Sequence, residues 1–126
     1  MIVLVDTSVW VDYFRDAGRA GAVDELITEN LAATNELILC EIVPPLALRN
    51  ERGLIRLLGQ LKQCPLTIDW HGIRQMQIAC LRHGINKVGI PDLIIAQNAI
   101  QCGATLLSND RHFGLLSEIT SLKVYR

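Results

Sequence analysis

The sequence predicts an α/β domain with a central, mainly parallel, five-stranded sheet flanked by helices. Two observations predict it: short apolar runs recur along the chain, and segments of helical length and pattern separate them. The chain has 126 residues, of which 50% are hydrophobic and 20% charged, and this suits a single domain over residues 1–126 with one core.

In the first half of the chain, apolar runs predict two buried strands, and three helical segments lie around them. Pro44-Pro45 is expected to interrupt or to start the third helix, because proline fits a first turn but not a helix interior. In chain order we expect a strand over 2–5, a helix from Thr7 or Ser8 to Arg15, a helix over 22–31, a strand over 37–40, and a helical segment reaching Lys62 with a break at Gly53.

The second half of the chain repeats this alternation of strands and helices. Gly84 and Gly103 are expected to end two helices, and Pro91 and Asp92 are residues that a first helical turn favours. In order we expect a strand over 65–68, a helix over 70–83, a helix from Ile90 to Gly103, a strand over 104–107, a short helix from near Arg111, and a last strand over 122–125.

Composition excludes several classes of protein. The net charge of −1 and pI of about 6.3 argue against a protein that holds nucleic acid by bulk electrostatics. No apolar run is long enough for a membrane span, and the N-terminus resembles no secretory signal. The four cysteines form no zinc-binding pattern and are expected to be buried, reduced thiols in a cytoplasmic protein.

Four acidic residues fall at positions where an α/β sheet collects ligands. Asp6 and Glu41 directly follow the first and second expected strands, and Asp110 follows the strand ending at Leu107 by three residues. Asp92 lies at a helix N-terminus behind a tight Gly-Ile-Pro turn. Because ligands gather at the carboxyl ends of parallel strands, we expect these acids to share one edge of the sheet.

Four converging carboxylates require a counter-charge. Two of them ~5 Å apart at an effective dielectric of ~20 repel by roughly 3 kcal/mol. Four would cost on the order of 10 kcal/mol, comparable to the ~5–15 kcal/mol stability of a domain. An oxygen-only ligand set selects Mg²⁺ or Mn²⁺, and such an ion usually takes phosphate oxygens as further ligands and promotes phosphodiester hydrolysis.

Each acid also has a simpler interpretation that needs no metal. Asp6 and Asp92 would then be helix caps, Glu41 a solvated or salt-bridged residue, and Asp110 a residue of the turn-rich Ser-Asn-Asp sequence. All four of these simpler interpretations must hold at once if there is no metal site.

Four segments resemble the PIN-domain nucleases, and more narrowly the VapC-type toxins of prokaryotic toxin–antitoxin pairs. The resemblance covers the whole chain, with all four acids in the family's order. The segments are Val5-Asp6-Thr7-Ser8-Val9-Trp10, Glu36 to Ile42, Gly89-Ile90-Pro91-Asp92-Leu93-Ile94-Ile95-Ala96, and Leu107-Ser108-Asn109-Asp110-Arg111-His112-Phe113.

This resemblance implies a PIN-like three-layer domain and an Mg²⁺- or Mn²⁺-dependent endoribonuclease acting on single-stranded RNA. It implies that Asp6, Glu41, Asp92 and Asp110 are catalytic, and we expect Asp6, Asp92 and Asp110 to hold the metal. Hydroxyls at Thr7 or Ser8 and at Ser108 would support the site. The resemblance also implies a homodimer that is neutralised by a cognate antitoxin.

Basic and aromatic residues have two interpretations each. Arg49, Arg52 and Arg56 share a helix face, which is either solvated or a rim that binds RNA or the antitoxin. Arg15 and Arg111 are candidates for the same role. His112 is not expected to be the general base, and Trp10, Tyr13 and Phe14 are expected in the core or a dimer interface.

Two other functions remain open. A phosphotransferase of the haloacid-dehalogenase kind also has an Asp after its first strand, but it needs a second Asp two positions later, where this chain has Ser8. A non-catalytic PIN-like module that binds RNA or a partner would have lost an acid of the set, and none is missing here.

Overall fold

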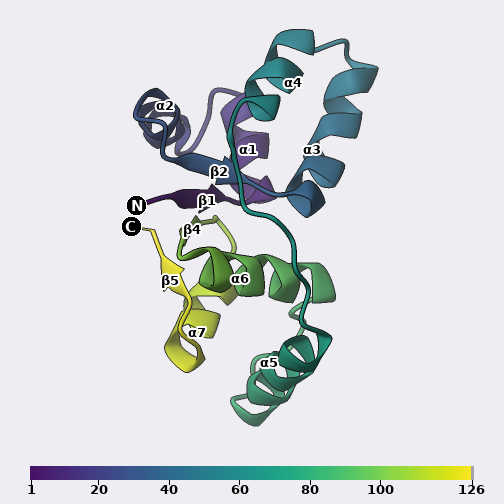
Figure 1. Ribbon diagram of the computed structural model, residues 1–126, viewed down its shortest axis with the longest axis vertical. Coiled ribbons are helices and arrows are strands. Elements are labelled where there is room, and N and C mark those ends of the chain that lie inside the picture. The colour runs from purple at the N-terminus through teal and green to yellow at the C-terminus, as the bar shows by residue number, and fades with distance from the viewer. Residues whose placement is uncertain (126) are drawn as a thin grey trace.

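The computed structural model describes residues 1–125 and contains one five-stranded parallel sheet (Figure 1). The strand order is β3-β2-β1-β4-β5, and every neighbouring pair is parallel, as predicted. The strands are β1 (Val3–Val5), β2 (Ala32–Thr34), β3 (Lys62–Gln63), β4 (Thr105–Leu107) and β5 (Lys123–Val124).

Helices cover the sheet and make the fold three-layered. In Figure 1, α1 to α4 lie in the upper half of the view and α5 to α7 in the lower half beside β5, and both chain ends lie at the same side of the sheet. The helices are α1 (Thr7–Phe14), α2 (Ala20–Thr28), α3 (Glu36–Leu48), α4 (Arg52–Gly59), α5 (Trp70–Arg82), α6 (Ile90–Cys102) and α7 (Arg111–Ile119).

The central strands β1 and β4 end at the same level of the sheet. Val5 pairs with Leu107 across them, and the backbone N–H of Asp6 donates to the carbonyl oxygen of Leu107 at 2.9 Å. Apart from Thr105 both strands are apolar, and their last residues are fully buried, as a parallel sheet covered on two faces requires. The residues that follow them, Asp6 and Ser108, therefore leave the sheet side by side.

The α1 helix is fixed to this edge by its aromatic residues. Trp10 is fully buried, and its indole N–H donates to the carbonyl oxygen of Val5 at 3.1 Å. Tyr13 and Phe14 are partly buried and pack against Trp10, with ring centroids 5.5 and 6.0 Å away. The three rings were expected in the core or in a dimer interface, and they lie in or against the core.

The predicted strand over 37–40 is wrong, because this segment lies in helix α3. The strand is the preceding Ala32–Thr34. All three of its residues are buried, although alanine has a low preference for strands. Asn35 begins the helix by accepting the Ile38 backbone N–H at 2.8 Å with its side chain. A four-residue apolar run fits a buried strand or a buried helix equally well. Here the Asn35 cap directly before the run favours the helix.

Pro44 and Pro45 lie inside α3 and do not interrupt or start it. Their missing N–H groups remove two helical hydrogen bonds, yet the helix runs on to Leu48. The buried residues Ile38, Ile42 and Leu46 recur every four positions, so one apolar face anchors the helix on both sides of the prolines.

Three smaller expectations also need correction. The third strand is Lys62–Gln63, just before the predicted 65–68, and the helical break falls at residues 49–51, before Gly53. Cys64 and Cys80 are buried as expected, but Cys40 is exposed on α3 and Cys102 is half-buried. Within residues 1–125, no helix is long and apolar enough to cross a membrane.

Candidate functional site

Asp6 is a buried carboxylate at the carboxyl end of β1. Only 6% of its surface is exposed, and although it stands at the N-cap of α1 its side chain makes no capping bond. Two hydroxyls donate to its Oδ2 instead, from Ser108 at 2.8 Å and from Ser8 at 3.0 Å. The capping interpretation of Asp6 therefore fails, and both predicted supporting serines contact it.

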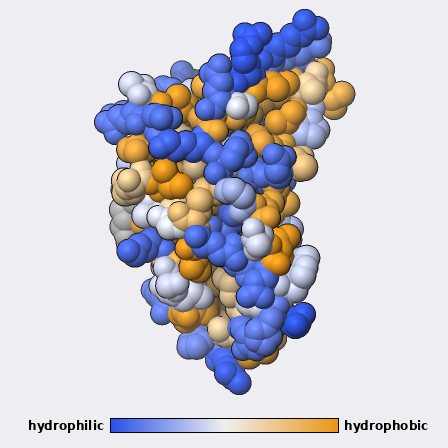
Figure 2. Space-filling model, in the orientation of Figure 1, coloured by the Kyte–Doolittle hydropathy of each residue, from blue (hydrophilic) through white to orange (hydrophobic). Residues whose placement is uncertain are grey.

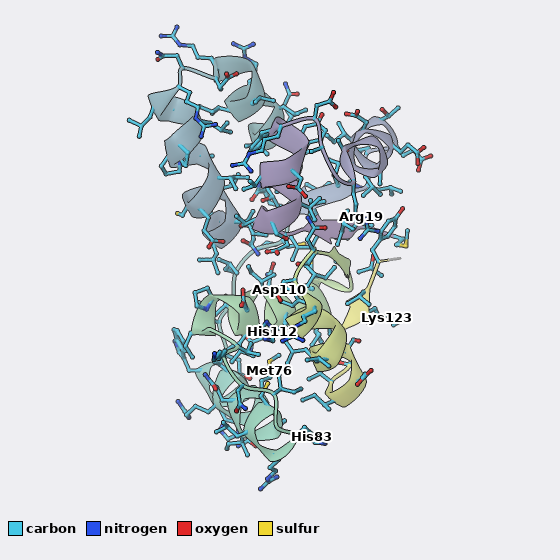
Figure 3. The ribbon with its side chains drawn as sticks, turned by 180° about the vertical axis from the view of Figure 1, so that it is seen from behind. Arg19, Met76, His83, Asp110, His112 and Lys123 are labelled. Carbon is cyan, nitrogen blue, oxygen red and sulfur yellow. The ribbon has the colours of Figure 1, made fainter. Side chains whose placement is uncertain are left out.

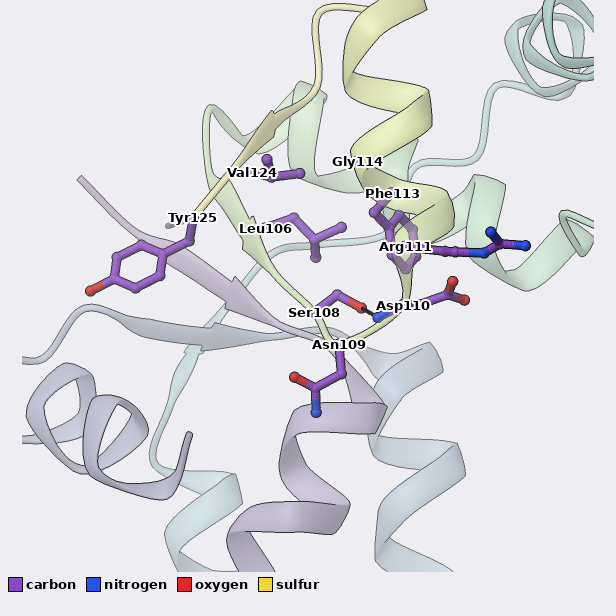
Figure 4. A pocket seen from close by; sticks show the side chains of 9 residues that line it. All are labelled: Leu106, Ser108, Asn109, Asp110, Arg111, Phe113, Gly114, Val124 and Tyr125. Carbon is purple, nitrogen blue, oxygen red and sulfur yellow. Dashed lines mark hydrogen bonds between the residues drawn. The ribbon is translucent and has the colours of Figure 1, made fainter. Parts of the chain in front are cut away.

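Ser108 connects Asp6 to a second acid. Besides donating to Asp6, its hydroxyl accepts the backbone N–H of Asp110 at 3.0 Å, the bond drawn in Figure 4. The Ser8 and Ser108 hydroxyl oxygens are 3.4 Å apart. The loop between β4 and α7 is thus fastened to the start of α1 through hydroxyl groups.

Asp110 begins α7 and does act as its cap. Its Oδ1 accepts the backbone N–H of His112 at 2.9 Å and lies 2.9 Å from the His112 ring nitrogen Nδ1. Figure 3 shows the two side chains together near the middle of the molecule, between the two groups of helices. Both contacts use Oδ1, so capping and a role for Oδ2 in the site are compatible.

Glu41 reaches the site from a helix. It lies in the second turn of α3, is exposed, and accepts a 2.8 Å hydrogen bond from the Thr7 hydroxyl. Glu41 therefore does not follow a strand, as the sequence had suggested, but it still meets the first residue of α1. Thr7 supports Glu41, while Ser8 supports Asp6.

Asp92 lies in the first turn of α6, where the charges of the other three acids act on it. Burial raises the pKa of Asp92 most, and neighbouring negative charges raise this pKa further, while His112 lowers it. Those charges belong to Asp110, Asp6 and Glu41. All four predicted acids thus share one electrostatic environment.

This proximity does not amount to direct coordination by three residues. Within residues 1–125, no group of three or more His, Cys, Asp and Glu side chains lies close enough to hold a metal ion by itself. The structure brings Asp6, Asp92 and Asp110 together without placing all three around one point. A magnesium ion is commonly held by one or two carboxylates, with water completing its shell.

The predicted arginines lie at different distances from the acids. Arg15 and Arg49 line a cavity of about 200 Å³ between α1 and α3 that also contains Glu41. Arg52 is exposed at the start of α4, directly after the turn that joins α3 to α4. Hydrophilic residues gather at the top of Figure 2, over this end of the molecule. Arg111 is exposed on α7, directly after Asp110.

A second cavity, of about 210 Å³, lies behind the β4–α7 loop (Figure 4). Ser108, Asn109, Asp110 and Arg111 line one part of it, and Val124 and Tyr125 of the last strand region line another. Of the four acids, only Asp110 reaches it. This cavity is therefore at the margin of the carboxylate cluster.

Asn109 is a site residue that the sequence reasoning missed. Its side-chain amide donates to Asp12 Oδ2 at 2.9 Å and to the Ser8 carbonyl oxygen at 3.4 Å, and its backbone N–H donates to the Ser8 hydroxyl at 3.1 Å. It fastens the loop that carries Asp110 to α1. The only signal was its place between Ser108 and Asp110.

A buried pair of asparagines was also missed. Asn35 donates from its amide to Asn98 Oδ1 at 2.9 Å, and Asn98 donates to the carbonyl oxygen of Pro65 at 3.0 Å. The pair links α3, which carries Glu41, to α6, which carries Asp92. No spacing in the sequence relates positions 35 and 98.

Comparisons with known proteins agree with this arrangement. The PIN domain family matches residues 3–118. The ribonuclease VapC11 of Mycobacterium tuberculosis is 30% identical, with 97% of this chain and 96% of the relative covered, and a VapC ribonuclease of Mycobacterium bovis matches equally well.

Solved structures share the fold. VapBC2 of Rickettsia felis, crystallised with a fragment of promoter DNA, has a TM-score of 0.76 at 20% identity and covers 99% of this chain and 98% of its own. FitAcB of Neisseria gonorrhoeae has a TM-score of 0.73 at 20% identity, with 99% and 97% covered. From the family match and the full-length relatives together, the chain belongs to the PIN-domain family and is of the VapC type.

Proposed function

We propose that this chain is an Mg²⁺- or Mn²⁺-dependent endoribonuclease toxin that hydrolyses single-stranded RNA and is inhibited by a cognate antitoxin. The observation that carries the proposal is the cluster of four carboxylates around Asp92, with Asp6 buried and fixed by two hydroxyls. The ribonuclease relatives at 30% identity support the same activity.

The residues present fit a divalent cation. Its donors would be carboxylate oxygens only, which favour a hard ion. Burial raises the pKa of Asp92 most, and the neighbouring negative charges raise it further. Asp6, Asp92 and Asp110 would hold the ion, some of them through water. When bound, the ion lowers the pKa of a coordinated water and offsets charge on the phosphate.

The chain's own residues prepare this site by holding the acids still. Ser8 and Ser108 fix one oxygen of Asp6 and leave Oδ1 directed elsewhere. Thr7 fixes Glu41, which we assign to orienting the attacking water or completing the ligand set. His112 and the first turn of α7 fix Oδ1 of Asp110.

The antitoxin is proposed to cover the groove between α1 and α3. This groove joins Glu41 to two arginines and to an apolar floor that includes Phe14 and Pro45. An occupant with apolar and acidic side chains would suit it and would block access to Glu41.

A homodimer is proposed from α5. Trp70, Ile78 and Leu81 lie within one face of this helix and are 55%, 40% and 67% exposed. A second copy of the chain would cover this face. Sedimentation equilibrium of the purified chain tests it, and a monomer at micromolar concentration would contradict it.

The nuclease is tested with Asp6→Asn and Asp92→Asn, which keep the shape of each side chain and remove its charge. Wild-type protein is expected to cleave single-stranded RNA with Mg²⁺ and not with EDTA, and both variants are expected to lose this cleavage. Full metal-dependent cleavage by either variant would refute the assignment.

Expression in cells completes the test. Wild-type chain is expected to arrest growth, with relief by the neighbouring gene product and discrete new ends in cellular RNA. A chain that binds RNA but neither cleaves it nor binds divalent ions would be the non-catalytic PIN-like module.

A further inference from the structure

A cavity of about 430 Å³ lies outside the carboxylate cluster, between the loop before α6 and the first turns of α7. The loop contributes Ile85, Asn86 and Lys87, and α7 contributes Arg111 and His112, with Leu115 at the edge. Its size is within the range of cavities that hold a small ligand such as a nucleotide.

Both walls of this cavity lie close in the chain to acids of the proposed site. Lys87 precedes Asp92 by five residues in the chain, and Arg111 and His112 follow Asp110 without a gap. The contact between the His112 ring and Asp110 Oδ1 joins the cavity to the acids. The cavity is therefore next to Asp110, on one side of the acids along which a strand of RNA could run.

The charges in the cavity favour an anion. Among the described residues that line it, none is acidic, and two are cations. Within residues 1–125 the single ion pair joins His112 to Asp110, so the Lys87 ammonium and the Arg111 guanidinium have no acidic partner. Both side chains are donors that bind phosphate oxygens well.

The backbone at Lys87 is unusual as well. Its φ is +67°, in the left-handed region that most side chains avoid. The other non-glycine residues with positive φ are Asp16, Asn30 and Asn50, of the types that tolerate this conformation. Sparsely populated backbone conformations cluster at functional sites, and here one places a lysine in the cavity wall.

We propose that this cavity is a subsite for the RNA phosphate that flanks the one being cut, with Lys87 and Arg111 as its ligands. Ile85 and Leu115 provide apolar contact for the attached nucleoside. The inference rests on the proposed function, since the acids define where the cut phosphate lies. RNA is favoured over an acidic protein segment because the cavity continues from those acids.

The first test measures binding of a short fluorescein-labelled single-stranded RNA in EDTA, over a series of salt concentrations. Affinity falls as salt rises, and each lost phosphate contact is expected to make the slope of log affinity against log salt less steep by about 0.7. Lys87→Ala and Arg111→Ala should each show this change, with affinity roughly threefold to tenfold weaker at low salt. Lys87→Arg should restore the slope.

Lys62→Ala is the matched control, since Lys62 is an exposed lysine on the edge strand β3. It should bind RNA as the wild type does. If Lys87→Ala and Arg111→Ala behave like this control, the subsite is refuted. Competition by polyglutamate as strong as by an RNA of equal charge would instead assign the cavity to an acidic protein.

A second test locates the phosphate. One methylphosphonate linkage, which is uncharged, is placed at successive positions of the RNA. Neutralising the linkage next to the cleavage point should weaken binding to wild type more than binding to Lys87→Ala, which keeps only the Arg111 contact. Equal weakening of both proteins would refute the contact.

The two proposals fail in different ways. RNA binding that depends on Lys87, in a protein that never cleaves, would refute the nuclease and reduce the subsite to an RNA-phosphate site that flanks no cleavage point. Cleavage that is lost in Asp6→Asn but untouched in Lys87→Ala, with an unchanged salt slope, would refute only the subsite. A wild-type chain that binds no RNA would refute both.

Discussion

Ser108→Ala is the substitution that most directly tests how the carboxylates are held. The Ser108 hydroxyl donates to Asp6 Oδ2 at 2.8 Å and accepts the Asp110 backbone N–H at 3.0 Å. Removing it frees one side of Asp6 and leaves the Asp110 N–H without its acceptor. The positions of two proposed metal ligands therefore change together.

The size of the effect on Mg²⁺ affinity depends on the hydrogen bonds that remain to Asp6 in Ser108→Ala. Groups that orient metal ligands are typically worth about 10- to 100-fold in metal affinity or activity. Because Ser8 still donates to Asp6 Oδ2 at 3.0 Å, we expect the lower end. Ser108→Ala should raise the Mg²⁺ concentration for half-maximal cleavage about tenfold and reduce the free energy of unfolding by about 1–2 kcal/mol.

The double variant Ser8→Ala/Ser108→Ala removes both donors to Asp6. It should raise the Mg²⁺ requirement by about 100-fold. Each single variant is expected to have a smaller effect than the double variant, because the remaining serine can still hold the shared oxygen.

The assay is RNA cleavage over a Mg²⁺ titration, with urea unfolding of each variant in EDTA. Ser117→Ala is the control: its hydroxyl donates to the Gly114 carbonyl oxygen within α7 and touches none of the acids. An identical Mg²⁺ requirement for Ser108→Ala and Ser117→Ala would refute the idea that hydroxyls organise this site.

Three further predictions concern other parts of the molecule. The pKa of Asp92 is raised above 3.8, so the protonated form is favoured by folding and metal-free stability should fall as the pH rises through that raised pKa. Asp92→Asn should therefore melt at a higher temperature than wild type in EDTA at pH 7, and an unchanged or lower melting temperature would contradict the charge cluster. Asn35→Ala removes a helix cap and leaves Asn98 Oδ1 unpaired, which should lower the urea-measured stability by about 2–4 kcal/mol. Burial raises the pKa of Cys64 to about 12, so a maleimide should label the exposed Cys40 and spare Cys64 in native protein, as peptide mapping would show.

The sequence predicted the positions of the candidate acids best where an acid closely follows a strand or lies in the first turn of a helix. Asp6 and Asp110 come after strands whose apolar runs are short and continuous, and Asp92 comes after a Gly-Ile-Pro turn that starts a helix. In each case local rules fix both the element and its end. The parallel topology then brings the ends of β1 and β4 together.

Glu41 shows why the rest could not be predicted in this way. Its helix begins at Asn35. The capping bond of Asn35 is local, but its buried side-chain amide donates to Asn98, 63 positions later. Contacts over that separation leave no periodic trace in one sequence. The Thr7 hydroxyl likewise meets Glu41 only because α1 packs on α3.

The near-neutral charge of the chain is compatible with an RNA substrate once the charges are located. Four of the thirteen acidic residues lie in one cluster, which leaves nine against twelve basic residues over the remaining surface. Two of the basic residues, Arg15 and Arg49, line the groove at Glu41, and two others, Lys87 and Arg111, line the cavity beyond Asp110. A divalent ion at the carboxylates would thus complete a cationic path on both sides of the cut phosphate. RNA affinity should therefore be higher in Mg²⁺ than in EDTA, and equal affinity in the two would contradict a cation at the carboxylates.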